Sequence, residues 1–182
     1  MYNIDYKTLS REEIEKFREI DRSEVIEHDY RYIDGKLELK KVFFDVKGFN
    51  PDHLQSLIHR LYGIYDDGGT IFGALEDWKL VGLSALEDRF RGENSDTLNC
   101  AILHISKQYR KMGIGRQLSQ LVMNKAREMG AKKLYVCSAP TKNTVDFYMG
   151  LGCRLADEVD EELYALEPED IHLILDLSKE PL

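Results

Sequence analysis

Cysteine is scarce in this chain, with three residues among 182. Cys100, Cys137 and Cys153 are odd in number, and each stands among apolar residues. A disulfide framework uses cysteines in pairs, so we expect three reduced, buried thiols and a cytoplasmic protein.

Long hydrophobic runs are also missing. No apolar stretch approaches the roughly 20 residues that a membrane-spanning helix needs. The first 17 residues carry four acidic side chains and lack the apolar run of a signal peptide. Basic residues are in the minority, because 25 lysines and arginines against 33 aspartates and glutamates give a formal net charge of −8. We therefore expect neither membrane association nor general binding of nucleic acid.

The composition is otherwise that of an ordinary globular domain, with 43% hydrophobic and 32% charged residues. A chain of this length buries roughly two thirds of its unfolded surface, so it needs no disulfide or structural metal to hold a core. There is no internal repeat and no linker rich in proline, glycine or serine. These features predict a single domain over residues 1–182.

Residues 1–65 are predicted to form an N-terminal extension made of a hairpin between two helices. The hairpin, over 28–44, is indicated by an Asp-Gly pair at Asp34 between runs of aromatic and β-branched residues. A capping signal indicates the start of each helix. These signals are a Ser-x-x-Glu box at Ser10 and an Asn-Pro pair at Asn50.

Residues 70–177 are predicted to form a core of alternating strands and helices. Short apolar runs between polar turns indicate the strands, and apolar residues at helical spacing indicate the helices. The predicted strands cover 70–75, 80–86, 98–106, 134–137 and 171–177, and the predicted helices cover 113–129 and 143–151. This order favours an α/β structure with a mixed, mostly antiparallel sheet flanked by helices.

A glycine-bearing turn leads from the strand over 98–106 into the next helix. The first turn of a helix leaves backbone N–H groups unpaired and carries partial positive charge. Gly113 and Gly115 allow an anion to approach that backbone closely. No acidic residue lies between 104 and 116, and four cations surround the turn, namely Lys107, Arg110, Lys111 and Arg116. In a chain of charge −8, this segment is typical of a phosphate or pyrophosphate site.

Two other phosphate-binding motifs do not fit this turn. A Walker loop requires Gly-x-x-x-x-Gly-Lys-Ser/Thr, which the sequence lacks. The dinucleotide fingerprint requires a third glycine where this chain has Leu118. What remains is Arg-x-x-Gly-x-Gly, from Arg110 to Gly115. Taken alone, this pattern is also explained by a basic, glycine-capped helix start that binds no ligand.

A second motif follows after one helix and one strand. It lies at 143–153, where Phe147 and Tyr148 are followed by Gly152. With both motifs in this order and spacing, the sequence resembles the GNAT superfamily of acyl-CoA-dependent N-acetyltransferases over about residues 70–177. The resemblance implies a GNAT-like fold, an acyl-CoA-binding core at 70–177 and acetyl-CoA as cosubstrate. It does not identify the amine that accepts the acetyl group.

The resemblance also implies which residues contact acetyl-CoA. The strand residues Leu103 and Ile105 would pair with the pantetheine arm in a splayed gap between the strands over 98–106 and 134–137, and the Leu103 N–H would point at the thioester carbonyl. Asn143 would contact the pantetheine or the thiol region. The pyrophosphate would lie against Arg110 and the backbone amides that follow it, those of Lys111, Met112, Gly113, Ile114, Gly115 and Arg116.

Tyr148 is the catalytic residue that the resemblance implies, beside the thioester sulfur as a candidate general acid. Proton transfer from a tyrosine of pKa about 10 to a thiolate whose thiol has a pKa near 8.5 is uphill by about 2 kcal/mol. We therefore expect Tyr148 to hydrogen-bond the departing sulfur, or to relay a proton that started on the amine. Its position on a helix is also explained by a half-buried packing role.

The sequence does not assign a general base. Some GNAT members carry a glutamate on the strand before the first motif, at a position occupied here by Asn99, which cannot accept a proton. The remaining alternatives are Glu87, Asp88, His104 and a chain of water molecules. Each of these side chains also has a structural explanation, as the polar end of a strand or as a packed histidine.

Other residue clusters predict no metal site, because the histidines and cysteines are not spaced to share an ion. The segment 157–162 holds five acids in six residues, which is usual for a solvated loop. Together with the net charge, it also favours a cationic acceptor such as a polyamine, an amino-sugar antibiotic or a basic peptide. The N-terminal hairpin and helices are expected either to shape the acceptor site or to form a homodimer surface.

The sequence thus predicts an enzyme that moves an acetyl group from acetyl-CoA to a primary amine by direct attack. No acyl-cysteine intermediate is expected, because a buried apolar thiol keeps a high pKa. The alternative is a non-catalytic acyl-CoA-binding or regulatory module on the same fold.

Overall fold

A seven-stranded sheet is the centre of the molecule in the computed structural model, which describes residues 3–178. Its strands lie in the order β1-β4-β5-β6-β7-β9-β8. Their bounds are β1 Asp5–Thr8, β4 Thr70–Glu76, β5 Lys79–Leu86, β6 Thr97–Ile105, β7 Lys133–Ser138, β8 Arg154–Leu155 and β9 Ile171–Asp176. All neighbouring pairs are antiparallel except β6 and β7, which run parallel. The predicted mixed, mostly antiparallel sheet is confirmed.

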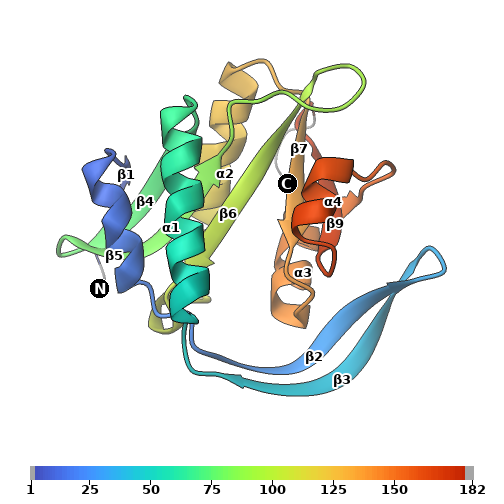
Figure 1. The fold of residues 1–182 in the computed structure, drawn as a ribbon, viewed down its shortest axis with the longest axis horizontal. Coiled ribbons are helices and arrows are strands. Elements are labelled where there is room, and N and C mark those ends of the chain that lie inside the picture. Colours follow the sequence, from blue (N-terminus) through green and yellow to red (C-terminus); the bar gives the residue numbers. More distant parts are fainter. Residues whose placement is uncertain (1–2, 179–182) are drawn as a thin grey trace.

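Helices cover both faces of this sheet (Figure 1). The 3-10 helix η1 (Glu12–Glu19), α1 (Pro51–Asp66) and α4 (Glu161–Leu166) lie on one face. The helices α2 (Ile114–Glu128) and α3 (Lys142–Met149) lie on the other, and a short 3-10 turn, η2 (Lys107–Tyr109), precedes α2. We call these the α1 face and the α2 face. All seven elements predicted over 70–177 are present.

Three apolar clusters hold the layers together, one on the α2 face and two on the α1 face. On the α2 face, Leu118 and Val122 of α2 are fully buried against the sheet. On the α1 face, Phe17 of η1 and Ile58 of α1 are fully buried as well. Burying one such side chain stabilises a fold by about 1.5–3 kcal/mol, so the amphipathic helices fix the positions of the loops that carry the site.

The N-terminal hairpin and the second helix form as predicted. Strands β2 (Glu24–Ile33) and β3 (Lys36–Val46) make a separate two-stranded sheet. Both residues of the connecting turn, Asp34 and Gly35, have positive φ, as a two-residue hairpin turn requires. The Asn50 side chain caps α1 by accepting the N–H of Asp52 at 2.9 Å.

Three details differ from the sequence predictions. The first helix is a 3-10 helix that the Ser10 hydroxyl does not cap, because this hydroxyl donates to the Glu12 carboxylate at 2.9 Å. The Ser10 backbone N–H donates to the Glu13 carboxylate at 3.0 Å, which is one half of the predicted capping box. The segment 157–162 is not wholly a solvated loop, because Asp160 caps α4 and accepts the Leu163 N–H at 3.0 Å. Acids in the first turn of a helix are stabilised by its dipole, which explains part of the run. Strand β1 was not predicted.

Strands β6 and β7 separate part-way along their length. They pair only from Thr97 to Cys100 on β6, opposite Lys133 to Val136 on β7. Beyond these residues they diverge, which confirms the predicted gap. Within residues 3–178, no strand pairs with the β7-facing edge of β6 from 101 to 105. We call this region the splay. A register shift between β5 and β6 at the same level adds a local bend to β6.

The β2–β3 hairpin passes across the open end of the splay (Figure 1). At the β6 side, the Arg110 guanidinium donates to the carbonyl of Ser23, just before β2, at 3.3 Å. At the β7 side, the Tyr30 N–H donates to the Pro140 carbonyl at 2.7 Å, and the Tyr30 hydroxyl donates to Asp146 of α3 at 2.9 Å. One strand therefore ties the ends of both diverging strands together.

Candidate active site

The turn before α2 has the backbone geometry that the sequence predicts for an anion site. Gly113 is the N-cap of α2, with a left-handed φ of 84°, and no side chain caps the first turn. A Cβ added at Gly113 would meet nothing within 4 Å, so the space beside the turn is open. Unpaired N–H groups and the helix dipole together make this turn suitable for a phosphate.

The side chains of the turn divide into exposed and packed ones. Lys107, Lys111 and Arg116 are exposed cations, and Met112 is 42% exposed. Ile114 is buried in the core, so only its backbone faces the site. A Cβ at Gly115 would come within 3.3 Å of the Phe147 ring, so this glycine allows α2 to approach α3 closely.

Arg110 has a different place from the other cations. Its guanidinium donates to the Ile105 carbonyl at 3.0 Å and to the Arg22 and Ser23 carbonyls at 3.3 Å, and it lies 3.5 Å from the Glu24 carboxylate. The side chain thereby fastens the end of β6 to the start of β2. The predicted contact of Arg110 with the pyrophosphate stays a prediction.

The free edge of β6 lies where the sequence predicts the pantetheine arm. Leu103 pairs with Ser84 of β5 on one side, and its other side faces the splay. The side chains of Leu103 and Ile105 pack against the core on the α2 face. Backbone N–H and C=O groups on an unpaired edge can accept an extended ligand as an added strand. The predicted contacts of both residues with the pantetheine arm stay predictions, and the Ile105 carbonyl already accepts from Arg110 at 3.0 Å.

Tyr148 is buried on α3, with 6% of its surface exposed. It borders a narrow apolar void of about 10 Å³ together with Cys100 and Cys153. Burial, with a smaller contribution from the neighbouring thiols, raises the pKa of Tyr148 well above 10. The hydroxyl therefore stays protonated near neutrality, and it can donate a hydrogen bond but not act as a base.

Asn143 is engaged by the hairpin. It is exposed near the start of α3, and its side-chain amide donates to the Glu24 carboxylate at 3.1 Å. The cap of α3 is Thr141, whose hydroxyl accepts the Thr144 N–H at 3.3 Å. The predicted contact of Asn143 with the pantetheine arm stays a prediction, and in this structure Asn143 holds β2 against α3.

Of the three side chains considered as bases, Glu87 and His104 have structural partners. Glu87 lies 3.0 Å from Arg91 and 3.8 Å from Arg60. His104 packs edge-on against two phenylalanine rings, with centroids 5.3–5.6 Å away. Burial lowers the pKa of His104 to about 3, and the neighbouring arginines add to this effect. Asp88 is exposed and lies beside the Gly68 turn.

Asp170 is a candidate base that sequence reasoning missed. It directly precedes β9, whose first residue, Ile171, pairs with Ser138 at the end of β7. This places Asp170 at the open end of the splay. Burial, and then the nearby Glu167 carboxylate, raise the pKa of Asp170 to about 7. The sequence around it reads only as an acidic turn, so no local signal distinguishes this carboxyl group.

Two buried polar residues, Asn99 and Tyr135, lie on the α1 face of the sheet. Asn99 of β6 is fully buried, and within the described residues 3–178 neither its amide oxygen nor its amide nitrogen has a hydrogen-bond partner. Tyr135, its register partner on β7, has its hydroxyl 2.9 Å from His172 Nδ1. Such unpaired groups are rare in folded proteins, and ordered water or a polar substrate would satisfy them.

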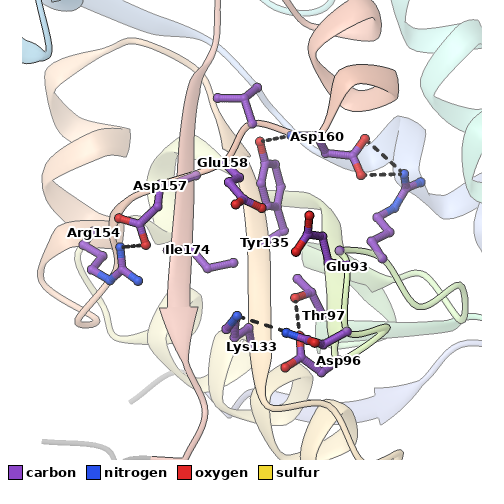
Figure 2. Close-up of a pocket in the computed structure, with 15 residues that line it drawn as sticks. Glu93, Asp96, Thr97, Lys133, Tyr135, Arg154, Asp157, Glu158, Asp160 and Ile174 are labelled. Atoms are coloured by element: carbon purple, nitrogen blue, oxygen red, sulfur yellow. Dashed lines mark hydrogen bonds and ion pairs between the residues drawn. The ribbon is translucent and has the colours of Figure 1, made fainter.

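A separate pocket of about 300 Å³ lies at the closed end of the β6–β7 pair (Figure 2). Thr97 and Lys133, the first paired residues of the two strands, line it, together with Glu93 and Asp157. In Figure 2, Arg154 is already held by Asp157, at 2.6 Å. The pocket is at the opposite end of β6 from the Gly113 turn, so it is not part of the candidate site.

The cysteines follow the sequence prediction in two of three cases. Cys100 and Cys153 are free and buried, whereas Cys137 is free and only partly buried. The prediction of a buried Cys137 is therefore wrong, because β7 has lost β6 as a neighbour at this level of the sheet and keeps only β9. Burial still raises the pKa of the Cys137 thiol far above its usual value. A thiol in this state is a poor nucleophile.

Among residues 3–178, no group of three or more His, Cys, Asp or Glu side chains is arranged to hold a metal ion. Within the same residues, no helix has both the length and the apolar character needed to cross a membrane.

Comparison with known families and structures agrees with this geometry. The family model of the GNAT acetyltransferases matches residues 36–153. The chain belongs to the GNAT acetyltransferase family. It is therefore an acetyltransferase of the acetyl-CoA-dependent kind, and the open β6 edge and the Gly113 turn fit that cosubstrate. No curated protein sequence matched the chain.

Solved structures of other GNAT proteins share the fold. A nourseothricin acetyltransferase superposes with a TM-score of 0.69 at 23% identity, covering 96% of this chain and 98% of that one. A streptothricin acetyltransferase homologue from Bacillus anthracis, in complex with acetyl-CoA, gives 0.64 at 16% identity, with 96% and 98% covered. PaiA N-acetyltransferase from Thermoplasma acidophilum, in complex with coenzyme A, gives 0.63 at 16% identity, with 96% and 99% covered.

Proposed function

We propose that this GNAT protein transfers the acetyl group of acetyl-CoA to a primary amine of a small cationic molecule or peptide, by direct attack. The observation that carries the proposal is the free β6 edge at 101–105, flanked by the Gly113 turn and by buried Tyr148. Acetyl-CoA supplies the acetyl thioester. The chain supplies the groups that bind, orient and move protons.

Each part of the site has one task in this proposal. The amides from Lys111 to Arg116 hold the pyrophosphate, and the β6 edge at Leu103 and Ile105 holds the pantetheine arm. The Leu103 N–H stabilises the oxyanion that forms when the amine attacks, a contribution that is worth several kcal/mol in comparable sites. Tyr148 donates a hydrogen bond to the departing sulfur, for which its raised pKa keeps it protonated.

The acceptor approaches on the α1 face, where carboxylates gather at the end of β7. Asp29 forms an isolated β-bridge with Thr141, beyond β7. Its carboxylate is buried, and one of the two oxygens has no hydrogen-bond partner among the residues that the structure describes. Asp170 lies next to the same strand end. An ammonium group or a second amine of the acceptor would satisfy such oxygens. Two structural neighbours, named as streptothricin and nourseothricin acetyltransferases, support a small-molecule acceptor.

Asp170 is the base in this proposal. An amine with a pKa of about 10.4 is mostly charged at pH 7, and its deprotonation costs about 4–5 kcal/mol. A base works best when its own pKa lies near the working pH, and burial has brought the pKa of Asp170 to about 7. Below that pH the carboxyl group takes up a proton and loses its capacity as a base.

Replacing Asp170 by asparagine is expected to lower kcat/KM for the amine about a hundredfold at pH 7.5. The pH profile should lose its inflection near pH 7, because only the titration of the amine then remains. The free energy of unfolding should not fall, since a carboxyl group with a raised pKa destabilises the folded state when it ionises. Initial rates measured from pH 5.5 to 9 give kcat/KM and its pH profile for the wild type and the variant.

The matched control is Asp157→Asn, which removes an exposed carboxylate outside the splay. This variant should keep the wild-type profile. An Asp170→Asn enzyme that retains the inflection near pH 7 would exclude Asp170 as the base.

The reaction itself is tested by release of free thiol from acetyl-CoA in the presence of single amines. The panel contains a polyamine, an amino-sugar antibiotic, streptothricin, a lysine peptide and a neutral amine. We expect turnover with at least one cationic acceptor, a product heavier by one acetyl group, and weak activity with the neutral amine. Thiol release that does not depend on any amine contradicts the proposal.

The second candidate is an acyl-CoA-binding or regulatory module without catalysis. The burial of Tyr148 in the main core favours it, because packing alone explains that position. Both candidates bind acetyl-CoA, so binding does not separate them. Saturable acetyl-CoA binding with no acetylated product across the panel would favour the module.

A further inference from the structure

Glu24, the first residue of β2, lies between the two sides of the splay. One oxygen of its carboxylate, Oε1, accepts a hydrogen bond from the Asn143 side-chain amide at 3.1 Å. The other oxygen, Oε2, lies 3.5 Å from the Arg110 guanidinium. Arg110 follows β6, and Asn143 belongs to α3, which follows β7. A single carboxylate therefore bridges the open end of the splay from one side to the other.

Both partners of Glu24 are residues that the sequence predicts to contact acetyl-CoA. Arg110 is predicted to lie beside the pyrophosphate, and Asn143 is predicted to contact the pantetheine or the thiol region. A guanidinium and a side-chain amide are hydrogen-bond donors, and both carboxylates and phosphates accept from such donors. Glu24 thus engages two donors that a phosphorylated cosubstrate would use.

The Glu24 contact brings negative charge to a segment whose own sequence carries none. No acidic residue lies between 104 and 116, where four cations surround the turn before α2. The side chains of Arg110 and Glu24 are only 29% and 23% exposed, so salt screens their attraction less than that of a surface pair. A phosphate that approached Arg110 would also approach the Glu24 carboxylate, and the two like charges would repel each other.

The Glu24 side chain can turn away while the backbone of β2 stays in place. The backbone has its own attachments, because the Tyr30 N–H donates to the Pro140 carbonyl at 2.7 Å and Glu24 pairs with Val46 of β3. Rotation about the side-chain bonds of Glu24 is therefore enough to free both donors. No strand has to move.

We propose that Glu24 is an internal competitor of acetyl-CoA. In the free protein its carboxylate engages Arg110 and Asn143, and acetyl-CoA displaces it on entering the splay. Because Glu24 competes only if acetyl-CoA enters between β6 and β7, this role rests on the proposed function. The carboxylate returns to both donors after the reaction and so favours release of the CoA product, a step that limits the rate of many enzymes.

Glu24→Gln tests the proposal in the intact chain. The substitution keeps a side-chain oxygen that can accept from Asn143, but it removes the charge that attracts Arg110. Isothermal titration calorimetry should show that the variant binds both acetyl-CoA and CoA about tenfold more tightly than the wild type. This is the gain expected when a competing state that holds about 90% of the molecules is removed.

Glu27→Gln is the matched control, because Glu27 lies on the same strand, is exposed and undergoes the same change of charge. This variant should bind acetyl-CoA as the wild type does, which separates the Glu24 contact from the net charge of the chain. Thermal melts followed by circular dichroism should show that both variants are folded. A folded Glu24→Gln protein that binds acetyl-CoA no more tightly than the wild type would overturn the proposal.

Failure of the Glu24 proposal can be told apart from failure of the proposed function. If the wild type acetylates an amine but Glu24→Gln leaves the affinity for acetyl-CoA unchanged, only the role of Glu24 is wrong. If Glu24→Gln tightens binding but no amine is acetylated, the role of Glu24 holds and acetyl transfer to an amine does not. A wild-type protein that binds no acetyl-CoA would overturn both.

Discussion

A Gly113→Val variant is expected to bind acetyl-CoA at least about a hundredfold more weakly than the wild type, since each charge-assisted bond to a phosphate contributes about 1.5–3 kcal/mol. Two effects act together. The new side chain would fill the open space beside the turn, where nothing now lies within 4 Å of a Cβ. A β-branched residue at a φ of 84° would also shift the turn, and with it the amides. Isothermal titration calorimetry with acetyl-CoA measures the loss.

Gly130→Val provides a matched control for backbone strain. Gly130 also has a left-handed φ, of 94°, and also has nothing within 4 Å of its Cβ, but it lies just beyond the other end of α2. Both variants should lose a similar free energy of unfolding, whereas only Gly113→Val should lose affinity. A Gly113→Val protein that is folded and binds acetyl-CoA normally would show that the pyrophosphate lies elsewhere.

The second large effect is expected from Tyr148→Phe. This variant keeps the ring that packs in the core and removes only the hydroxyl. We expect kcat to fall about a hundredfold, the usual range for a lost proton donor, while the affinity for acetyl-CoA stays within about twofold. The wild-type hydroxyl is protonated throughout the accessible pH range because burial raises the pKa of Tyr148, so the loss should not depend on pH from 6 to 9.

Tyr6→Phe serves as the control, since Tyr6 also packs against the main core but lies on β1, at the far edge of the sheet. Steady-state rates with the best acceptor from the amine panel, together with calorimetric titrations, separate catalysis from binding. If Tyr148→Phe turns over at the wild-type rate, the hydroxyl has no part in the reaction and Tyr148 is a packing residue.

The turn before α2 could be predicted from sequence because its chemistry lies in the backbone. Gly113 adopts a φ that favours glycine, and Gly115 leaves room for Phe147. Both requirements follow from residue type within a few positions. The strand and helix order over 70–177 was predictable for a similar reason, since each element shows the periodicity of the face that it buries.

Side-chain partners across the fold could not be predicted in the same way. Arg110 and Asn143 both meet Glu24, which lies more than 80 residues away in the sequence. No local pattern indicates that β2 would use these side chains. The pKa of Asp170 depends on burial and on Glu167, and therefore on tertiary packing that residue spacing does not encode. The unpaired amide of Asn99 could not be predicted for the same reason, because its burial depends on the assembled sheet.

The attachment of β2 to both diverging strands has a mechanical consequence. Ser23, just before β2, is hydrogen-bonded to Arg110 in the turn after β6, and Tyr30 of β2 is hydrogen-bonded to Pro140 in the loop after β7. The segment from Ser23 to Tyr30 therefore links the ends of the two diverging strands. The angle between β6 and β7 is thus set during folding. A cosubstrate that enters the splay would find β6 and β7 already held apart. The entropy of fixing these two strands is then lost on folding and not on binding.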